Sequence, residues 1–276
     1  LVALDPGHGG IDPGADADFA RQLGCAVDFE ALASVPLDAS IPGARSVKTV
    51  LDRSEDGALY FQNSERYPIH WDFASQNLSL PDHAPVPPLA DFNSSEYASP
   101  SRRFVLGAVT RYDGPGFWTW ELAPYDAADA SMILAGYRAV RDNAWMGEEL
   151  RFHPTSEALE AVAAALPAEV LQVSTDTLFA GIDYQPLNLA TAMGRLSFAT
   201  GGEVGELGSR DVAVLEAVPN DLPLVAGLIT AAFQTPLAHV NVLSQNRGTP
   251  NMALRGAWQD PALRALEGRQ VELRVG

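Results

Sequence analysis

The chain has 276 residues, of which 47% are hydrophobic, and its 35 acidic and 18 basic residues give a net charge of −17. This length suffices for two domains of ordinary size, and the composition is that of a globular protein rather than a disordered one. The negative charge argues against nucleic acid or an anionic membrane surface as a partner, because both require a basic face.

Three further features of the sequence exclude particular kinds of site or segment. Lys48 is the only lysine, and since kinase-type nucleotide sites place a lysine on the phosphates, we expect this chain to hold no nucleotide site of its own. Cys25 is the only cysteine, so no internal disulfide can form. The longest apolar stretch, residues 222–233, contains Pro223 and is too short to span a bilayer. We therefore expect no membrane-spanning segment.

Residues 1–25 form a segment rich in Gly, Pro and Asp that begins Leu-Val-Ala-Leu-Asp-Pro-Gly-His-Gly-Gly-Ile-Asp-Pro-Gly. This motif resembles the first motif of zinc-dependent N-acetylmuramoyl-alanine amidases, which implies His8 as a zinc ligand. A catalytic zinc needs about three protein ligands, and the glutamate and the Ser-x-His-x-Asn motif of the amidases have no counterpart here. A linker is the favoured interpretation, and a zinc amidase built on His8 is kept as an alternative.

Residues 26–199 predict a mixed α+β domain whose first hundred residues are mainly β. Residues 46–51 and 58–62 are two β-rich runs joined by a loop with an Asp-Gly pair, which is typical of a hairpin turn. Residues 104–111 and 117–122 predict a second hairpin across a Gly-Pro-Gly turn.

An aromatic stripe runs through this β-rich part. Residues 67–73 continue the aromatic run of the first hairpin, and the stripe consists of Trp71, Trp118 and Trp120. Such a stripe is either a sugar-stacking platform or the packed aromatic core of a small sheet. The packed core is the favoured interpretation.

The later part of this domain turns α/β. Asp126 or Asp129 caps a helix with apolar residues at helical spacing. Residues 149–153 then read as a strand, 157–166 as a helix and 170–173 as a second strand, an order that predicts a right-handed parallel crossover. The histidine that ends the first of these strands is expected to be structural.

Residues 200–209, Thr-Gly-Gly-Glu-Val-Gly-Glu-Leu-Gly-Ser, form a glycine-rich acidic joint. They do not fit a phosphate loop, because no lysine follows and two glutamates would repel phosphate. They predict a hinge in front of a mobile domain at residues 210–276.

The most informative stretch is residues 235–250, Thr-Pro-Leu-Ala-His-Val-Asn-Val-Leu-Ser-Gln-Asn-Arg-Gly-Thr-Pro. Thr235 and Pro236 suit the cap and first turn of a helix, and Gly248 suits the left-handed residue that closes it. An imidazole nitrogen is nucleophilic near neutral pH, and helix N-termini favour anions. His239, early on a short helix between two strands, therefore fits a carrier of a phosphoryl group.

This stretch resembles the phosphohistidine swivelling domain of the dikinase superfamily, which includes phosphoenolpyruvate synthase, pyruvate phosphate dikinase and the α-glucan water dikinases. In those families a histidine opens a short helix, with a glycine nine residues and a proline eleven residues further on. His239, Gly248 and Pro250 keep this spacing. The resemblance covers residues 210–276 and implies a β/β/α swivelling fold.

The sequence departs from the family pattern at two positions. Ala238 stands where the families place Ser, Thr or Cys, and Gln245 stands where they place an arginine, with Arg247 two residues later. A non-catalytic binding module with a degenerate swivelling domain is therefore a further alternative.

The resemblance implies a phosphotransferase of the kind found in bacteria. His239 would accept a phosphoryl group from ATP and relay it to pyruvate, water or a glucan, with Thr235 and Arg247 as phosphate contacts. ATP and Mg²⁺ would be held by a separate ATP-grasp domain, either beyond Gly276 or on another chain. ATP dependence would place the protein in the cytoplasm, whereas the sequence itself leaves the compartment open.

Overall fold

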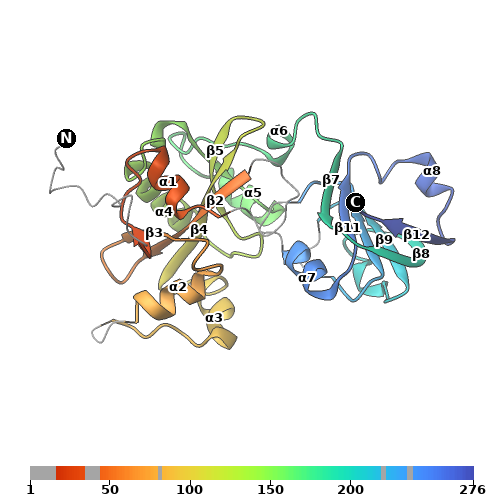
Figure 1. The fold of residues 1–276 in the computed structure, drawn as a ribbon, viewed down its shortest axis with the longest axis horizontal. Helices are drawn as coiled ribbons and strands as arrows, with labels where there is room; N and C mark the ends of the chain where they lie inside the picture. The colour runs from red at the N-terminus through yellow and green to blue at the C-terminus, as the bar shows by residue number, and fades with distance from the viewer. Residues whose placement is uncertain (1–16, 35–43, 80–82, 219–221, 235–238) are drawn as a thin grey trace. The chain divides into compact units, whose positions relative to one another are not determined.

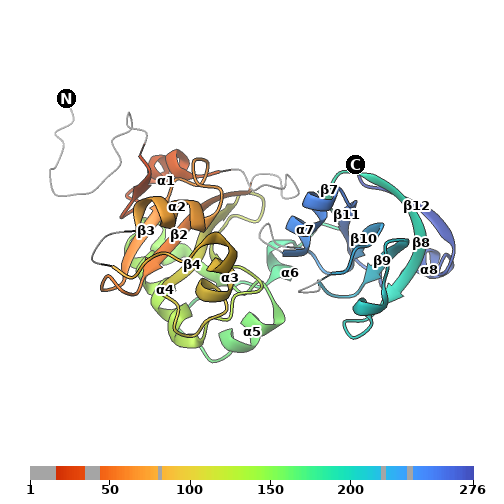
Figure 2. The same ribbon diagram turned by 90° about the horizontal axis from the view of Figure 1, so that it is seen from below.

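The computed structural model describes residues 17–34, 44–79, 83–218, 222–234 and 239–276 (Figures 1 and 2). The chain divides into two compact units, of which unit 1 ends at Ser174 and unit 2 runs from Thr175 to Gly276. Each unit contains one six-stranded sheet, so the protein is of the mixed α+β class. Among the described residues, no helix has both the length and the hydropathy needed to cross a bilayer.

The sheet of unit 1 contains both predicted hairpins, and all its neighbouring strands pair antiparallel except the parallel pair β5 and β6. The first hairpin turns at Asp56 and Gly57, whose φ angles of 48° and 76° are those that an Asp-Gly pair accepts most readily. In spatial order the strands are β1 (Phe19–Ala20), β3 (Ala58–Gln62), β2 (Ala44–Asp52), β4 (Phe104–Tyr112), β5 (Phe117–Leu122) and β6 (Leu150–His153).

Helices cover both faces of this sheet. The predicted cap of the fourth helix is confirmed at Asp129, whose carboxylate accepts a hydrogen bond from the Met132 N–H at 2.9 Å. The prediction of β structure for residues 67–73 was wrong, because a helix begins at His70 and buries residues at a spacing of three and four. The helices are α1 (Ala26–Leu32), α2 (His70–Asn77), α3 (Leu89–Glu96), α4 (Ala130–Asp142), η1 (Gly147–Glu149) and α5 (Glu157–Ala163).

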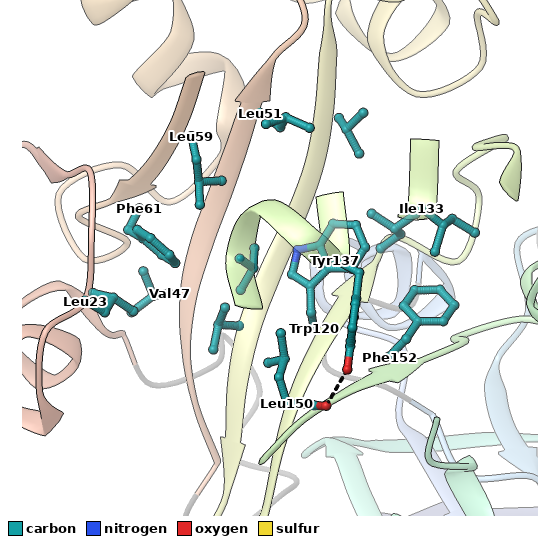
Figure 3. Close-up of a cluster of buried hydrophobic side chains, with 14 of the residues drawn as sticks. Leu23, Val47, Leu51, Leu59, Phe61, Trp120, Ile133, Tyr137, Leu150 and Phe152 are labelled. Atoms are coloured by element: carbon teal, nitrogen blue, oxygen red, sulfur yellow. Dashed lines mark hydrogen bonds between the residues drawn. The ribbon is translucent and has the colours of Figure 1, made fainter. Parts of the chain in front are cut away.

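One face of the sheet packs against α1, α4 and α5 around Trp120 (Figure 3). The indole N–H of Trp120 donates to the Thr49 hydroxyl at 3.1 Å, and its ring passes so close to α4 that a Cβ on Gly136 would lie 2.3 Å from it. The Tyr137 hydroxyl donates to the Leu150 carbonyl at 2.7 Å. The indole N–H and the tyrosine hydroxyl thus each have a hydrogen-bond partner inside an apolar cluster.

The opposite face carries a second apolar cluster under α2 and α3, which lie side by side in Figures 1 and 2. Trp71 packs against this cluster, whereas Trp118 and Trp120 belong to the first. The three tryptophans are therefore split between two faces and do not form one platform. The favoured interpretation of the stripe as packed core is confirmed.

The sheet of unit 2 has four parallel central strands, β8 to β11 in sequence order, and an antiparallel strand at each edge. The spatial order is β12 (Gln270–Arg274), β8 (Thr191–Ala199), β9 (Asp211–Leu215), β10 (Gly227–Thr230), β11 (Asn251–Leu254) and β7 (Tyr184–Asn188). The helical segments are α6 (Thr175–Leu178), η2 (Val204–Glu206), α7 (His239–Arg247) and α8 (Pro261–Arg264).

The domain boundary lies at residue 174 and not, as the sequence predicts, at residue 199, because β7 and β8 belong to the sheet of unit 2. Residues 200–209, predicted to be a hinge, join the adjacent parallel strands β8 and β9 within unit 2. Val204 lies in the apolar cluster of this unit with Leu207 packed against it, and the Glu203 carboxylate accepts hydrogen bonds from the N–H and hydroxyl of Thr200. The segment is a packed loop inside one unit, so it does not separate two domains.

Candidate functional site

Helix α7 places His239 at the carboxyl end of the parallel strands. The helix forms the crossover between β10 and the parallel strand β11, and His239 is its first residue. In open α/β sheets, ligands bind outside the carboxyl ends of parallel strands, at the start of the helices that follow them. Val240 packs the helix against the apolar cluster on this face of the sheet. The His239 side chain and all of Thr235 lie outside the described residues.

Helix α7 ends just before Gly248, as the sequence predicts. Gly248 has a φ of 64°, in the left-handed region that favours glycine, and the Thr249 N–H donates to the Ser244 carbonyl at 2.9 Å. The Asn188 amide N–H₂ of β7 donates to the carbonyls of Ser244 and Thr249 at 3.1 and 2.7 Å. Asn188 therefore fastens the closing end of the helix to the edge strand.

A buried set of side-chain amides lies between α7 and the sheet. The Gln234 side-chain amide donates to the Thr230 hydroxyl and to the Asn251 side-chain oxygen, both at 3.0 Å. The Asn251 amide donates in return to the Gln234 side-chain oxygen at 3.2 Å and to the Ser244 hydroxyl at 3.0 Å. The Ser244 hydroxyl donates to the Val240 carbonyl in the first turn of α7 at 2.8 Å.

Gln185 of β7 extends this set to the backbone that leads toward His239. Its side-chain oxygen accepts from the Gln234 N–H at 3.0 Å, and its amide donates to the Gln234 carbonyl at 2.8 Å. We call Gln185, Thr230, Gln234, Ser244 and Asn251 the amide network. Every member is at most 2% exposed, and none carries a charge.

Arg247, predicted to contact phosphate, lies at the other end of α7 from His239. Eight residues of helix rise separate the two, which corresponds to about 12 Å. The Arg247 guanidinium donates to the carbonyls of Leu222 and Pro223 at 3.0 and 3.4 Å. In this structure the arginine ties the helix end to a neighbouring loop, and its phosphate contact stays a prediction.

A different arginine follows the carboxyl end of β11. Arg255 places its guanidinium 5.0 Å from the ring centroid of Phe233 and donates to the carbonyls of Ile182 and Phe179. Its side chain is also within 4 Å of the carboxylates of Asp176 and Asp183. Two nearby aspartates oppose the approach of an anion, so we do not assign a phosphate contact to this arginine.

The described histidines in the core of unit 1 have structural partners. His70 is held by the Tyr97 hydroxyl on Nδ1 at 2.8 Å and by the Gly107 carbonyl on Nε2 at 3.0 Å. Burial, reinforced by the nearby Lys48 charge, lowers the pKa of His70 to about 3. His153 lies in the core with Nδ1 2.9 Å from a Glu121 carboxylate oxygen, which agrees with the structural role expected for it.

The zinc ligand of the amidase alternative, His8, lies outside the described residues. Within the parts of the chain that are described, no group of three or more His, Cys, Asp or Glu side chains is placed to hold a metal ion.

No protein-family model and no curated protein matches this chain. Function is therefore inferred from the chain's own residues and their geometry. Of these residues, the sequence points to His239 through its position in a helix pattern. It gives no signal for the amide network, because neutral amides follow no period and take their meaning from partners distant in sequence.

Proposed function

We propose that unit 2 carries a phosphoryl group on His239 and is the phosphohistidine part of a dikinase-type phosphotransferase. The observation that supports this proposal most directly is the position of His239 as the first residue of α7, in the crossover from β10 to β11. The partial positive charge of a helix N-terminus favours phosphate, and α7 is nine residues long. The spacing of His239, Gly248 and Pro250 supports the same assignment.

The proposed chemistry splits one phosphoryl transfer into two. An imidazole nitrogen of His239 attacks phosphorus, a P–N bond forms, the P–O bond to the nucleotide breaks, and the ring gives up its other proton. An acceptor oxygen from the enol of pyruvate, from water or from a glucan then attacks phosphorus, the P–N bond breaks, the acceptor gives up its proton, and the imidazole takes up a proton to return to its starting state. Covalent catalysis of this kind replaces one difficult step by two easier ones.

ATP and Mg²⁺ would be held by a separate ATP-grasp domain, where the metal neutralises the phosphate charge. A tether between that domain and unit 2 would keep the carrier at high effective concentration. The mobility that the carrier needs would reside at the junction of the two units near Ser174, since residues 200–209 are packed inside unit 2.

Incubation with radiolabelled ATP and an ATP-grasp domain of a dikinase tests this proposal. We expect one label per chain that is labile in acid and stable in alkali, absent from a His239→Ala variant and retained in a His83→Ala control. Failure of the wild-type chain to take up label, or equal labelling of the His239→Ala variant, would overturn the proposal.

A further inference from the structure

We infer that Gln234 and Asn251 are positioning residues for His239. They hold the start of α7 in one place against the sheet, so that the imidazole meets its phosphoryl donor in a fixed geometry. This inference rests on the proposed function of His239, but its physical core, the fixed position of the helix, can be measured independently.

The amide network contacts the chain on both sides of His239. Gln234 lies five residues before it, and both backbone polar groups of Gln234 are bonded to the Gln185 side chain. Ser244 lies five residues after it and bonds the Val240 carbonyl in the first turn of the helix. Asn251 joins the two sides, because its amide bonds the Gln234 and Ser244 side chains at once.

A hydrogen-bonded contact between helix and sheet fixes the position of the helix more strictly than an apolar contact does. Apolar packing is roughly proportional to buried area and has no direction, so a helix held by it alone can shift without losing much free energy. Hydrogen bonds between buried amides are directional, and leaving one unmade inside the protein is costly. The Asn251 amide makes such a bond to the Ser244 hydroxyl of α7, and its pairing with Gln234 through two further bonds fixes the orientation of that amide, so the three bonds together specify one position of α7.

A side chain that takes up and passes on a phosphoryl group reacts faster when it is held in one position. A displacement of about 1 Å in a reacting group lowers a rate by up to about a hundredfold. Because the network contains no ionisable group, it holds this position without its own dependence on pH. A carrier histidine that visits two sites has to present the same geometry at each.

The test compares Gln234→Leu and Asn251→Leu with a matched control, Asn188→Leu. All three variants remove a buried or half-buried side-chain amide. Gln234 and Asn251 bond to each other inside the network, whereas Asn188 bonds the closing end of the helix, away from His239. Ser244→Ala is a milder variant that removes the hydroxyl link and keeps the pairing of Gln234 with Asn251. Each protein is studied as the full chain, and its folded fraction is measured by urea unfolding.

Two readouts separate positioning from stability. The first is the rate of labelling of His239 from ATP and the ATP-grasp domain, per folded molecule. We expect it to fall at least about tenfold in the two network variants, less in Ser244→Ala, and not more than about twofold in Asn188→Leu. The second is the NMR spectrum of the His239 imidazole, which should show one set of resonances in the wild type and in Asn188→Leu and broadened or multiple resonances in the network variants.

The outcomes distinguish the two proposals. If the wild type takes no label, the proposed function fails, and the imidazole spectra still decide whether the network fixes His239. If the wild type is labelled but the network variants keep its rate and its single set of resonances, the positioning role is overturned. If Asn188→Leu loses as much as Asn251→Leu, general destabilisation explains the effect, which also overturns it. Should the leucine variants not fold, a Ser244→Ala protein with wild-type rate and spectrum overturns it as well.

Discussion

Replacing His70 by glutamine should make the stability of unit 1 less sensitive to acid. His70 is 6% exposed, and burial, reinforced by the nearby Lys48 charge, lowers its pKa to about 3 from its ordinary value of 6.5. The folded protein therefore keeps this ring neutral where the unfolded chain takes up a proton. Its contribution to stability is fully present above pH 6.5 and is lost as the pH falls toward 3.

The size of the fall in unfolding free energy follows from the difference between the pKa of His70 in the folded and in the unfolded protein. Each pH unit between the two pKa values corresponds to about 1.4 kcal/mol, so the unfolding free energy should fall by about 3 kcal/mol from about pH 6.5 to about pH 4 through this residue alone. Glutamine does not titrate, but its amide can donate to the Gly107 carbonyl and its oxygen can accept from the Tyr97 hydroxyl, as the histidine nitrogens do.

Urea unfolding at a series of pH values measures this difference. Tryptophan fluorescence reports mainly on unit 1, because four of the five tryptophans, Trp71, Trp118, Trp120 and Trp145, lie there. Tyr97→Phe is the matched control, since it removes one hydrogen bond to His70 but leaves the titrating ring, and it should keep the wild-type slope. Equal slopes for wild type and His70→Gln between pH 6.5 and 4 would refute the reasoning.

Two further predictions concern the core of unit 1, and urea unfolding checks both. Gly136→Ala should destabilise by about 1 to 3 kcal/mol, more than the helix propensity it gains, because the new methyl group would lie 2.3 Å from the Trp120 ring. Gly205→Ala, with nothing within 4 Å of its Cβ, should change stability by less than about 0.5 kcal/mol, and an equal effect of the two substitutions would contradict the packing argument. Asp126→Asn should cost about 3 to 5 kcal/mol, because it leaves the guanidinium of Arg102, whose side chain is 0% exposed, without a compensating negative charge, and a loss below about 1 kcal/mol would contradict this.

Local signals in the sequence predicted local structure well. Both hairpins of unit 1 were found because turn chemistry acts over a few residues, as the positive φ angles of Asp56 and Gly57 show. The end of α7 at Gly248 was found for the same reason. Helix α2 was missed because Trp71 and Phe73 are two residues apart, as in a strand, whereas the residues that the helix buries, His70, Phe73 and Ala74, are spaced by three and four.

Contacts between distant segments were not predictable in the same way. The boundary at Ser174 depends on the pairing of β7 with β11 and of β8 with β12, each far away in sequence. The amide network depends on Gln185, Gln234 and Asn251 meeting from three segments. The sequence pointed to the histidine of the candidate site, and its supporting residues became visible only in the fold.

Site-resolved mass spectrometry tests the central proposal most directly. The chain is incubated with ATP, Mg²⁺ and an ATP-grasp domain, digested at alkaline pH, and the mass of one phosphoryl group is located among the five histidines. The proposal predicts that it is found on His239 and disappears after brief acid treatment. A phosphoryl group on another residue, or on none, would contradict it.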